Sequence, residues 1–130
     1  SALVYVLVSG RALPVQGTVQ LIQQAGAGPR LATALLAVLV APVVEEVTFR
    51  GLVFRSLRLR TGFWGAALIS ASLFALIHLD PLHSLRLAAL GLVLAWVYER
   101  TGSLWPAIFL HSVQNLVAVV TIYLSLLPAS

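Results

Sequence analysis

Residues 31–59, LATALLAVLVAPVVEEVTFRGLVFRSLRL, form a long apolar run with two adjacent carboxylates and an arginine near its middle. A helix that crosses a membrane needs about 20 mostly apolar residues, so this stretch is long enough to span a bilayer. Three arginines at positions 55, 58 and 60 and the helix breaker Gly62 close the run. We therefore predict one long helix from Leu31 to about Leu59.

Three further apolar segments follow, and they predict helices over residues 63–79, 82–98 and 104–127. Asp80 is expected to be the N-cap of the second of these helices, with Pro81 in its first turn, and Ser103 is expected to cap the third. Before the long helix, residues 2–8 predict the tail of a partial helix and residues 18–25 an interfacial segment within a loop.

The composition places the chain in a bilayer. Of its 130 residues, 60% are hydrophobic and 9% are charged, whereas soluble domains carry roughly 25% charged residues. We predict an all-α fold, a polytopic transmembrane helix bundle of four to five spans with its active site in an intramembrane cavity. It forms one domain over residues 1–130, with its motif core at about 31–125 and a partial helix and interfacial loop at 1–30.

The charged residues predict an orientation. All eight basic residues are arginines, and several lie at the ends of apolar runs, which is a topology signal and argues against the dense basic face of a nucleic-acid-binding protein. The arginine-rich turns near residues 60 and 100 are expected to be cytoplasmic in a bacterial inner membrane. Trp64, Trp96 and Trp105 fall beside them as an aromatic belt. Arg86 is the exception, and we expect it to snorkel from the opposite end.

Several polar residues lie inside the predicted spans, where an unpaired charge costs about 2.5–3.5 kcal/mol. Glu46 and Arg50 are four residues apart on one helical face, so they are interpreted as a structural ion pair. Glu45 points about 100° away around the helix and has no local cation. Glu45 is therefore the candidate for a functional carboxylate.

Two more pairs at the same spacing add hydrogen-bonding groups. Phe74 and His78 share one helix face, and His111 and Asn115 share another. A single intramembrane histidine is ordinarily an interhelical hydrogen bonder. Two imidazoles, an amide and an unpaired carboxylate on three spans instead favour a shared site.

In order, EEVTFR (45–50), FALIH (74–78) and HSVQN (111–115) resemble the EExxxR, FxxxH and HxxxN motifs of the CPBP family of intramembrane proteases, the type II CAAX prenyl endopeptidases and bacteriocin-processing proteins. The resemblance implies a catalytic Glu45 that activates a water with His78. It also implies that His111 and Asn115 stabilise the oxyanion and that Glu46 and Arg50 support the site.

The sequence leaves alternatives open for both the cofactor and the function. A carboxylate and two imidazoles would also suit a catalytic zinc held by Glu45, His78 and His111; the HExxH motif is absent, and we favour chemistry without a metal. The chain has no cysteine, so a cysteine nucleophile is excluded. The expected partners are membrane lipids and a peptide or protein segment that enters from the cytoplasmic leaflet. The alternatives are a non-catalytic binding or bacteriocin-immunity protein and a proton-coupled transporter.

Overall fold

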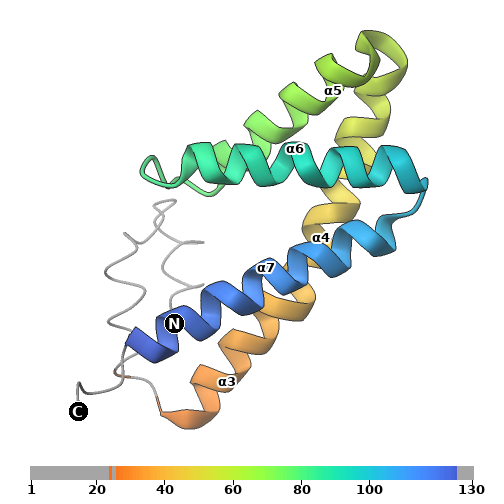
Figure 1. The fold of residues 1–130 in the computed structure, drawn as a ribbon. Coiled ribbons are helices and arrows are strands. Elements are labelled where there is room, and N and C mark those ends of the chain that lie inside the picture. Colours follow the sequence, from red (N-terminus) through yellow and green to blue (C-terminus); the bar gives the residue numbers. More distant parts are fainter. Residues whose placement is uncertain (1–23, 25, 126–130) are drawn as a thin grey trace, which may run out of the picture.

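The structure, a computed structural model, describes residue 24 and residues 26–125, and every regular element in this part of the chain is helical (Figure 1). The prediction of an all-α fold is confirmed for these residues. The predicted partial helix at 2–8, the interfacial segment at 18–25 except residue 24, and the end of the last predicted helix lie outside the described residues. In chain order the elements are α3 (Ala27–Leu35), the π-helical η1 (Leu36–Val40), α4 (Ala41–Glu46), the π-helical η2 (Val47–Phe54), α5 (Arg55–Ile77), α6 (Ser84–Thr101) and α7 (Leu104–Ser125).

The long predicted helix is present, and it begins at Ala27, four residues earlier than expected. Pro29 lies in its first turn, where a missing N–H costs no helical hydrogen bond. Helical backbone continues through η1, α4 and η2 into α5 until Gly62, whose φ of 72° and ψ of −177° break it. Glycine adopts this positive φ without a Cβ clash. The chain reverses there, at the top right of Figure 1, which confirms the predicted break.

The turn between α5 and α6 differs from the prediction. The Asp80 carboxylate accepts a hydrogen bond from the His83 backbone N–H at 3.1 Å and contacts His83 Nδ1 at 2.7 Å. This hydrogen bond with His83 lowers the pKa of Asp80. Because aspartate favours such local turns, α6 begins at Ser84, two residues later than expected, and Asp80 as its N-cap was wrong. The Ser103 cap is confirmed, since Ser103 Oγ accepts the Trp105 N–H at 3.3 Å.

Small side chains bring α5 and α6 close together. Gly91 of α6 lies against Ala71 of α5 so tightly that a Cβ on Gly91 would be 2.9 Å from both Ala71 Cα and Ala71 Cβ. Close backbone approach through small residues is typical of helix pairs in membranes. The buried residues along this contact and around it include Ala66, Ala67, Ser70, Ala71, Phe74, Leu94 and Ala95.

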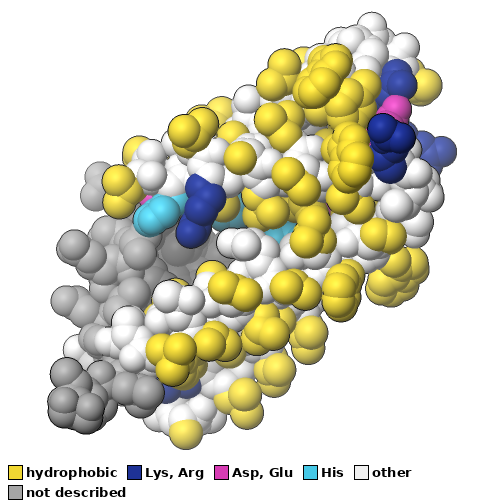
Figure 2. Space-filling view, viewed as in Figure 1, with side chains coloured by type: hydrophobic (Ala, Val, Ile, Leu, Met, Phe, Trp, Pro, Cys, Tyr) yellow, Lys and Arg dark blue, Asp and Glu magenta, His cyan; other side chains and the backbone are white. Residues whose placement is uncertain are grey.

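Large apolar side chains cover the outside of the bundle (Figure 2). Leu59 is 88% exposed, Leu82 87% and Trp105 75%. Exposed apolar area on this scale is stable against lipid rather than water. Two helical stretches, Ala27–Ile77 and Leu104–Ser125, are long and apolar enough to cross a membrane, with mean hydropathies of 1.9 and 1.7.

The two arginine-bearing turns lie at the same end of the bundle. Arg58 Nη2 is 2.8 Å from Glu99 Oε1, which ties the end of the first helical arm, the helical stretch of residues 27–61, to the end of α6. The Arg100 guanidinium lies 5.5 Å from the centre of the exposed Trp96 ring. This end therefore combines arginines and aromatic side chains, the composition expected at one membrane interface.

Candidate functional site

Three of the predicted site residues meet between α4, the end of α5 and α7. Glu45 Oε2 lies 3.8 Å from His78 Nε2 and 3.6 Å from His111 Nε2. The Phe74 ring packs between the imidazoles, with centroid distances of 4.7 Å to His78 and 5.5 Å to His111. One carboxylate oxygen thus faces two imidazole nitrogens from two other segments of the chain.

Glu46 forms a second, fully buried layer behind this group. Its Oε1 accepts hydrogen bonds from Arg50 Nη1 at 3.0 Å and from His111 Nδ1 at 2.9 Å. Arg50 also donates to the Gly91 carbonyl at 2.8 Å, and its guanidinium lies 5.0 Å from the centre of the Phe74 ring. The side chains of Glu46 and Arg50 are both 0% exposed, whereas Glu45 is 23% exposed. Glu46 therefore anchors His111, and Glu45 is the carboxylate that reaches open space.

The hydrogen bonds of the two imidazoles define which nitrogen carries a proton. His78 Nδ1 is 2.7 Å from the Phe74 carbonyl, and His111 Nδ1 is 2.9 Å from the Glu46 carboxylate. Both partners are acceptors, so each Nδ1 must donate. In neutral rings both Nε2 atoms then present lone pairs to Glu45 Oε2, and three acceptors face one another. The group needs a donor from outside it, a water or an added proton.

Asn115 donates a hydrogen bond to a backbone carbonyl of the first helical arm that has no helical N–H partner. Ala41 donates its backbone N–H to the Leu36 carbonyl in a π-helical bond, and the residue five positions after Ala37 is Pro42, which has no N–H. The Ala37 carbonyl instead accepts a hydrogen bond from Asn115 Nδ2 at 2.8 Å. One of the two Nδ2 protons is therefore used for positioning, and the other is not needed there.

A cavity of about 590 Å³ adjoins this group and is within the size range of ligand pockets. Glu45, His78, His111 and Asn115 all line it. The other lining residues are mostly apolar or small and come from α6, α7 and the first arm. They are Ala37, Ala41, Arg86, Leu87, Ala89, Leu90, Val93, Gln114, Ala118, Val119 and Ile122.

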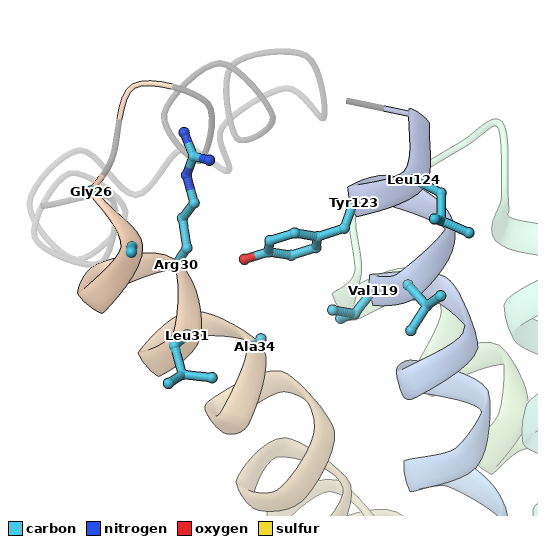
Figure 3. Close-up of a pocket in the computed structure, with 9 residues that line it drawn as sticks. Gly26, Arg30, Leu31, Ala34, Val119, Tyr123 and Leu124 are labelled. Carbon is cyan, nitrogen blue, oxygen red and sulfur yellow. The ribbon is translucent and has the colours of Figure 1, made fainter. Parts of the chain in front are cut away.

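A second cavity of about 680 Å³ lies between the first turns of α3 and the last turns of α7. Arg30 and Tyr123 lie on opposite sides of it, and Tyr123 points across toward α3 (Figure 3). No histidine or carboxylate among the described residues lines this cavity. Although it is the larger of the two, the candidate hydrolytic groups all belong to the smaller cavity.

The suggested zinc ligands do not form a metal site in this arrangement. Zinc bonds of about 2.0–2.2 Å put the donor atoms of a tetrahedral site roughly 3.4 Å apart. The Glu45 oxygen is 3.6 Å and 3.8 Å from the two imidazole nitrogens, and residues 24 and 26–125 contain no group of three His, Cys, Asp or Glu side chains placed to hold a metal ion. The donor types suit zinc, but their present spacing does not.

The fold and the site together define an all-helical protein with a lipid-compatible surface and a glutamate and histidine cluster that lines an internal cavity. Residues 27–117 match the family described as type II CAAX prenyl endopeptidase Rce1-like, and the chain belongs to that family. A relative in Bacillus subtilis (strain 168), named "Putative membrane peptidase YdiL", is 36% identical over 86 residues. That alignment covers 66% of this chain and 35% of the relative, so the chain spans about a third of that protein's length. No solved structure matches the chain significantly.

Two contacts of the site were not predicted from the sequence. The sequence predicted an ion pair of Glu46 with Arg50 alone, whereas Glu46 also binds His111 across the bundle. It predicted no hydrogen-bond partner for Asn115. The signal for that attachment was Pro42, because a proline inside a helix leaves a carbonyl on the preceding turn without its backbone donor.

Proposed function

We propose that this chain carries the active site of an intramembrane endopeptidase, in which Glu45 acts as the general base for a water molecule. One observation carries the proposal. Glu45 Oε2 is buried, has no hydrogen-bond partner among the described residues, and lies within 4 Å of two imidazole nitrogens. A water that donates to the Glu45 carboxylate and to His78 Nε2 would satisfy the acceptors that face each other.

The remaining steps follow from the same groups. Glu45 removes a proton as the water oxygen attacks the peptide carbonyl, and it returns that proton to the leaving amine. The second Nδ2 proton of Asn115 donates to the developing oxyanion. Donation from His111 Nε2 requires an imidazolium, whose charge the Glu46 carboxylate at 2.9 Å stabilises. Glu46 and Arg50 are supporting residues, because they reach the reaction through His111 and the helix backbone.

The membrane placement is part of the proposal. The helical stretches 27–61, 63–77, 84–101 and 104–125 form the core of a bundle of four to five spans, and lipid covers their exposed apolar faces. The arginine-bearing turns lie on the cytoplasmic side of a bacterial inner membrane. The substrate is a peptide or protein segment, which is what a protease family implies.

Replacing Glu45 by glutamine tests the role of this carboxylate. Glutamine has nearly the same shape and accepts no proton, so cleavage by Glu45→Gln should fall by about 10²–10⁴-fold, the usual contribution of a general base. The assay follows cleavage of a library of quenched fluorescent peptides by the full protein in detergent, with mass spectrometry of the products. Glu99→Gln is the control, because Glu99 pairs with Arg58 at the other end of the bundle and does not line the cavity among the described residues.

Two results would overturn the proposal. If Glu45→Gln cleaves as fast as the wild type, the carboxylate is not the base. If the wild-type protein binds peptides and cleaves none of them, a binding function of the immunity type explains the pocket better. Metal analysis and chelation belong to the same experiment: stoichiometric zinc with chelator-sensitive cleavage would replace the metal-free scheme.

A further inference from the structure

Arg86 lines the cavity that contains the candidate catalytic group, although the scheme above gives it no role. It is the third residue of α6, on the wall that faces α4 and α7 across the cavity. The sequence predicted only that this arginine would snorkel to the interface. Its side chain also lines the cavity that Glu45 and His78 line.

Arg86 is exposed, and the described part of the fold gives its charge no partner. Arg86 has no hydrogen bond or ion pair with any residue from 26 to 125 or with residue 24. The nearest carboxylate in sequence, Asp80, is bound to His83. An arginine in the first turn of a helix also faces the positive end of the helix dipole, which is unfavourable. The exposed guanidinium is therefore available to a ligand that enters the cavity.

The lining of the cavity indicates what that ligand is. Among the described residues that line the cavity, Arg86 is the one arginine and Glu45 is the one carboxylate. Gln114 of α7 adds an amide with no hydrogen bond in the described part of the chain, which suits a peptide backbone. Figure 2 shows a cationic side chain at the edge of a hollow on this face of the molecule. Arginine binds carboxylates in a planar, two-point geometry.

We propose that Arg86 is a specificity-determining residue that binds a carboxylate of the peptide substrate while Glu45 and the histidines meet the scissile bond. This inference rests on the proposed peptidase function. The carboxylate is either the C-terminal carboxylate of the peptide or the side chain of an aspartate or glutamate near the scissile bond. Both sources have the same chemistry, and they are separated by experiment.

The test compares matched peptides on the full protein in detergent. In the first pair, one peptide ends in a free carboxylate and the other in a carboxamide. In the second pair, one peptide has a glutamate within a few residues of the cleaved bond and the other has a glutamine there. The wild type should prefer one carboxylate form by about 10–100-fold in kcat/KM, the range of a bidentate charged contact. Arg86→Gln should abolish that preference, because it should slow the cleavage of the carboxylate-bearing peptide and leave the cleavage of the matched amide peptide unchanged. Arg60→Gln, which removes an exposed arginine far from the cavity, should leave it unchanged.

Binding measurements test this inference separately from the proposed reaction. The affinities of the same peptides are measured on Glu45→Gln protein with and without Arg86→Gln. A carboxylate preference in binding that disappears with Arg86→Gln supports the inference even if no peptide is cleaved, in which case the peptidase proposal alone fails. Equal binding and cleavage of both forms by the wild type, or an equal loss for both forms in Arg86→Gln, overturns the inference. A change confined to the dependence of activity on phosphatidylglycerol in vesicles also overturns it, because Arg86 would then bind a lipid headgroup.

Discussion

Glu46 is the residue on which the site and the fold depend together. One of its oxygens binds both Arg50 and His111, and all three side chains are almost completely buried. A buried carboxylate between two basic groups compensates their charge and fixes the orientation of the imidazole. The same residue therefore stabilises the contact between the first arm and α7 and aims His111 Nε2 at Glu45.

Removing this carboxylate should leave the arginine as a buried, uncompensated charge. Glu46→Leu is expected to lower the free energy of unfolding by about 3–5 kcal/mol, the usual cost of breaking a buried ion pair. The double variant Glu46→Leu/Arg50→Met removes both charges and should recover at least half of that loss. Thermal unfolding in detergent, followed by helical circular dichroism, measures both effects. A double variant less stable than Glu46→Leu would contradict this account of the pair.

The sequence predicted the contacts of the site that lie within one helix but not those between helices. The spacing of four residues correctly identified the Glu46 and Arg50 pair, because contacts within one helix follow from helical geometry. The contact between Glu46 and His111 joins residues 65 apart and depends on how α7 is rotated against the first arm. Periodicity carries no information on that rotation. The catalytic roles of Glu45, His78, His111 and Asn115 stay predictions until activity is measured.

Among the helices, α5 and α6 approach each other closely at Gly91. Gly91 permits two interactions at once, the approach of α6 to Ala71 and the exposure of its own carbonyl to Arg50. A side chain at this position would push against the backbone of α5, which cannot move away as a flexible side chain would. The position of α6, and with it the Arg86 wall of the cavity, depends on this glycine.

Gly91→Ala should therefore destabilise the bundle even though alanine favours helices. We expect a loss of about 1–3 kcal/mol from overpacking, measured by thermal unfolding in detergent. Gly51→Ala is the matched control, because its Cβ would lie at an ordinary 3.6 Å from Leu104 Cδ1. Gly51→Ala should keep or slightly raise the stability through its better helix propensity. Equal stability of the two variants would refute the close contact at Gly91.

The sequence predicted the positions of the helices more accurately than it predicted where they begin and end. Hydrophobic length and the breaker Gly62 placed the helices, since these signals are local. The start of α6 was wrong because the Asp80 carboxylate bonds within the turn rather than to the helix. The π-helical segments on both sides of Glu45 and Glu46 were not predicted, because no residue pattern distinguishes them from regular α-helix.

For the whole molecule, the direction of the cavity raises a conflict between two sequence predictions. The cavity residues on α7 run from His111 to Ile122, away from the arginine-bearing turn where α7 begins. Those on α6 run from Arg86 to Val93, in the half that starts at the opposite turn. If the arginine-bearing turns are cytoplasmic, the cavity lies toward the other leaflet. A substrate that enters through this cavity would then not come from the cytoplasmic leaflet.

Labelling of single cysteines decides the orientation, because the chain has no cysteine of its own. Leu59→Cys and Leu82→Cys are a matched pair, 88% and 87% exposed, beside the turn at Gly62 and in the turn before α6. With cytoplasmic arginines, a membrane-impermeant maleimide should label Leu82→Cys in intact spheroplasts, and Leu59→Cys only after permeabilisation. The reverse pattern would put the arginine-bearing turns outside and the cavity toward the cytoplasm. Labelling of both positions from one side would contradict the proposal that the helical stretch between them, residues 63–77, crosses the membrane.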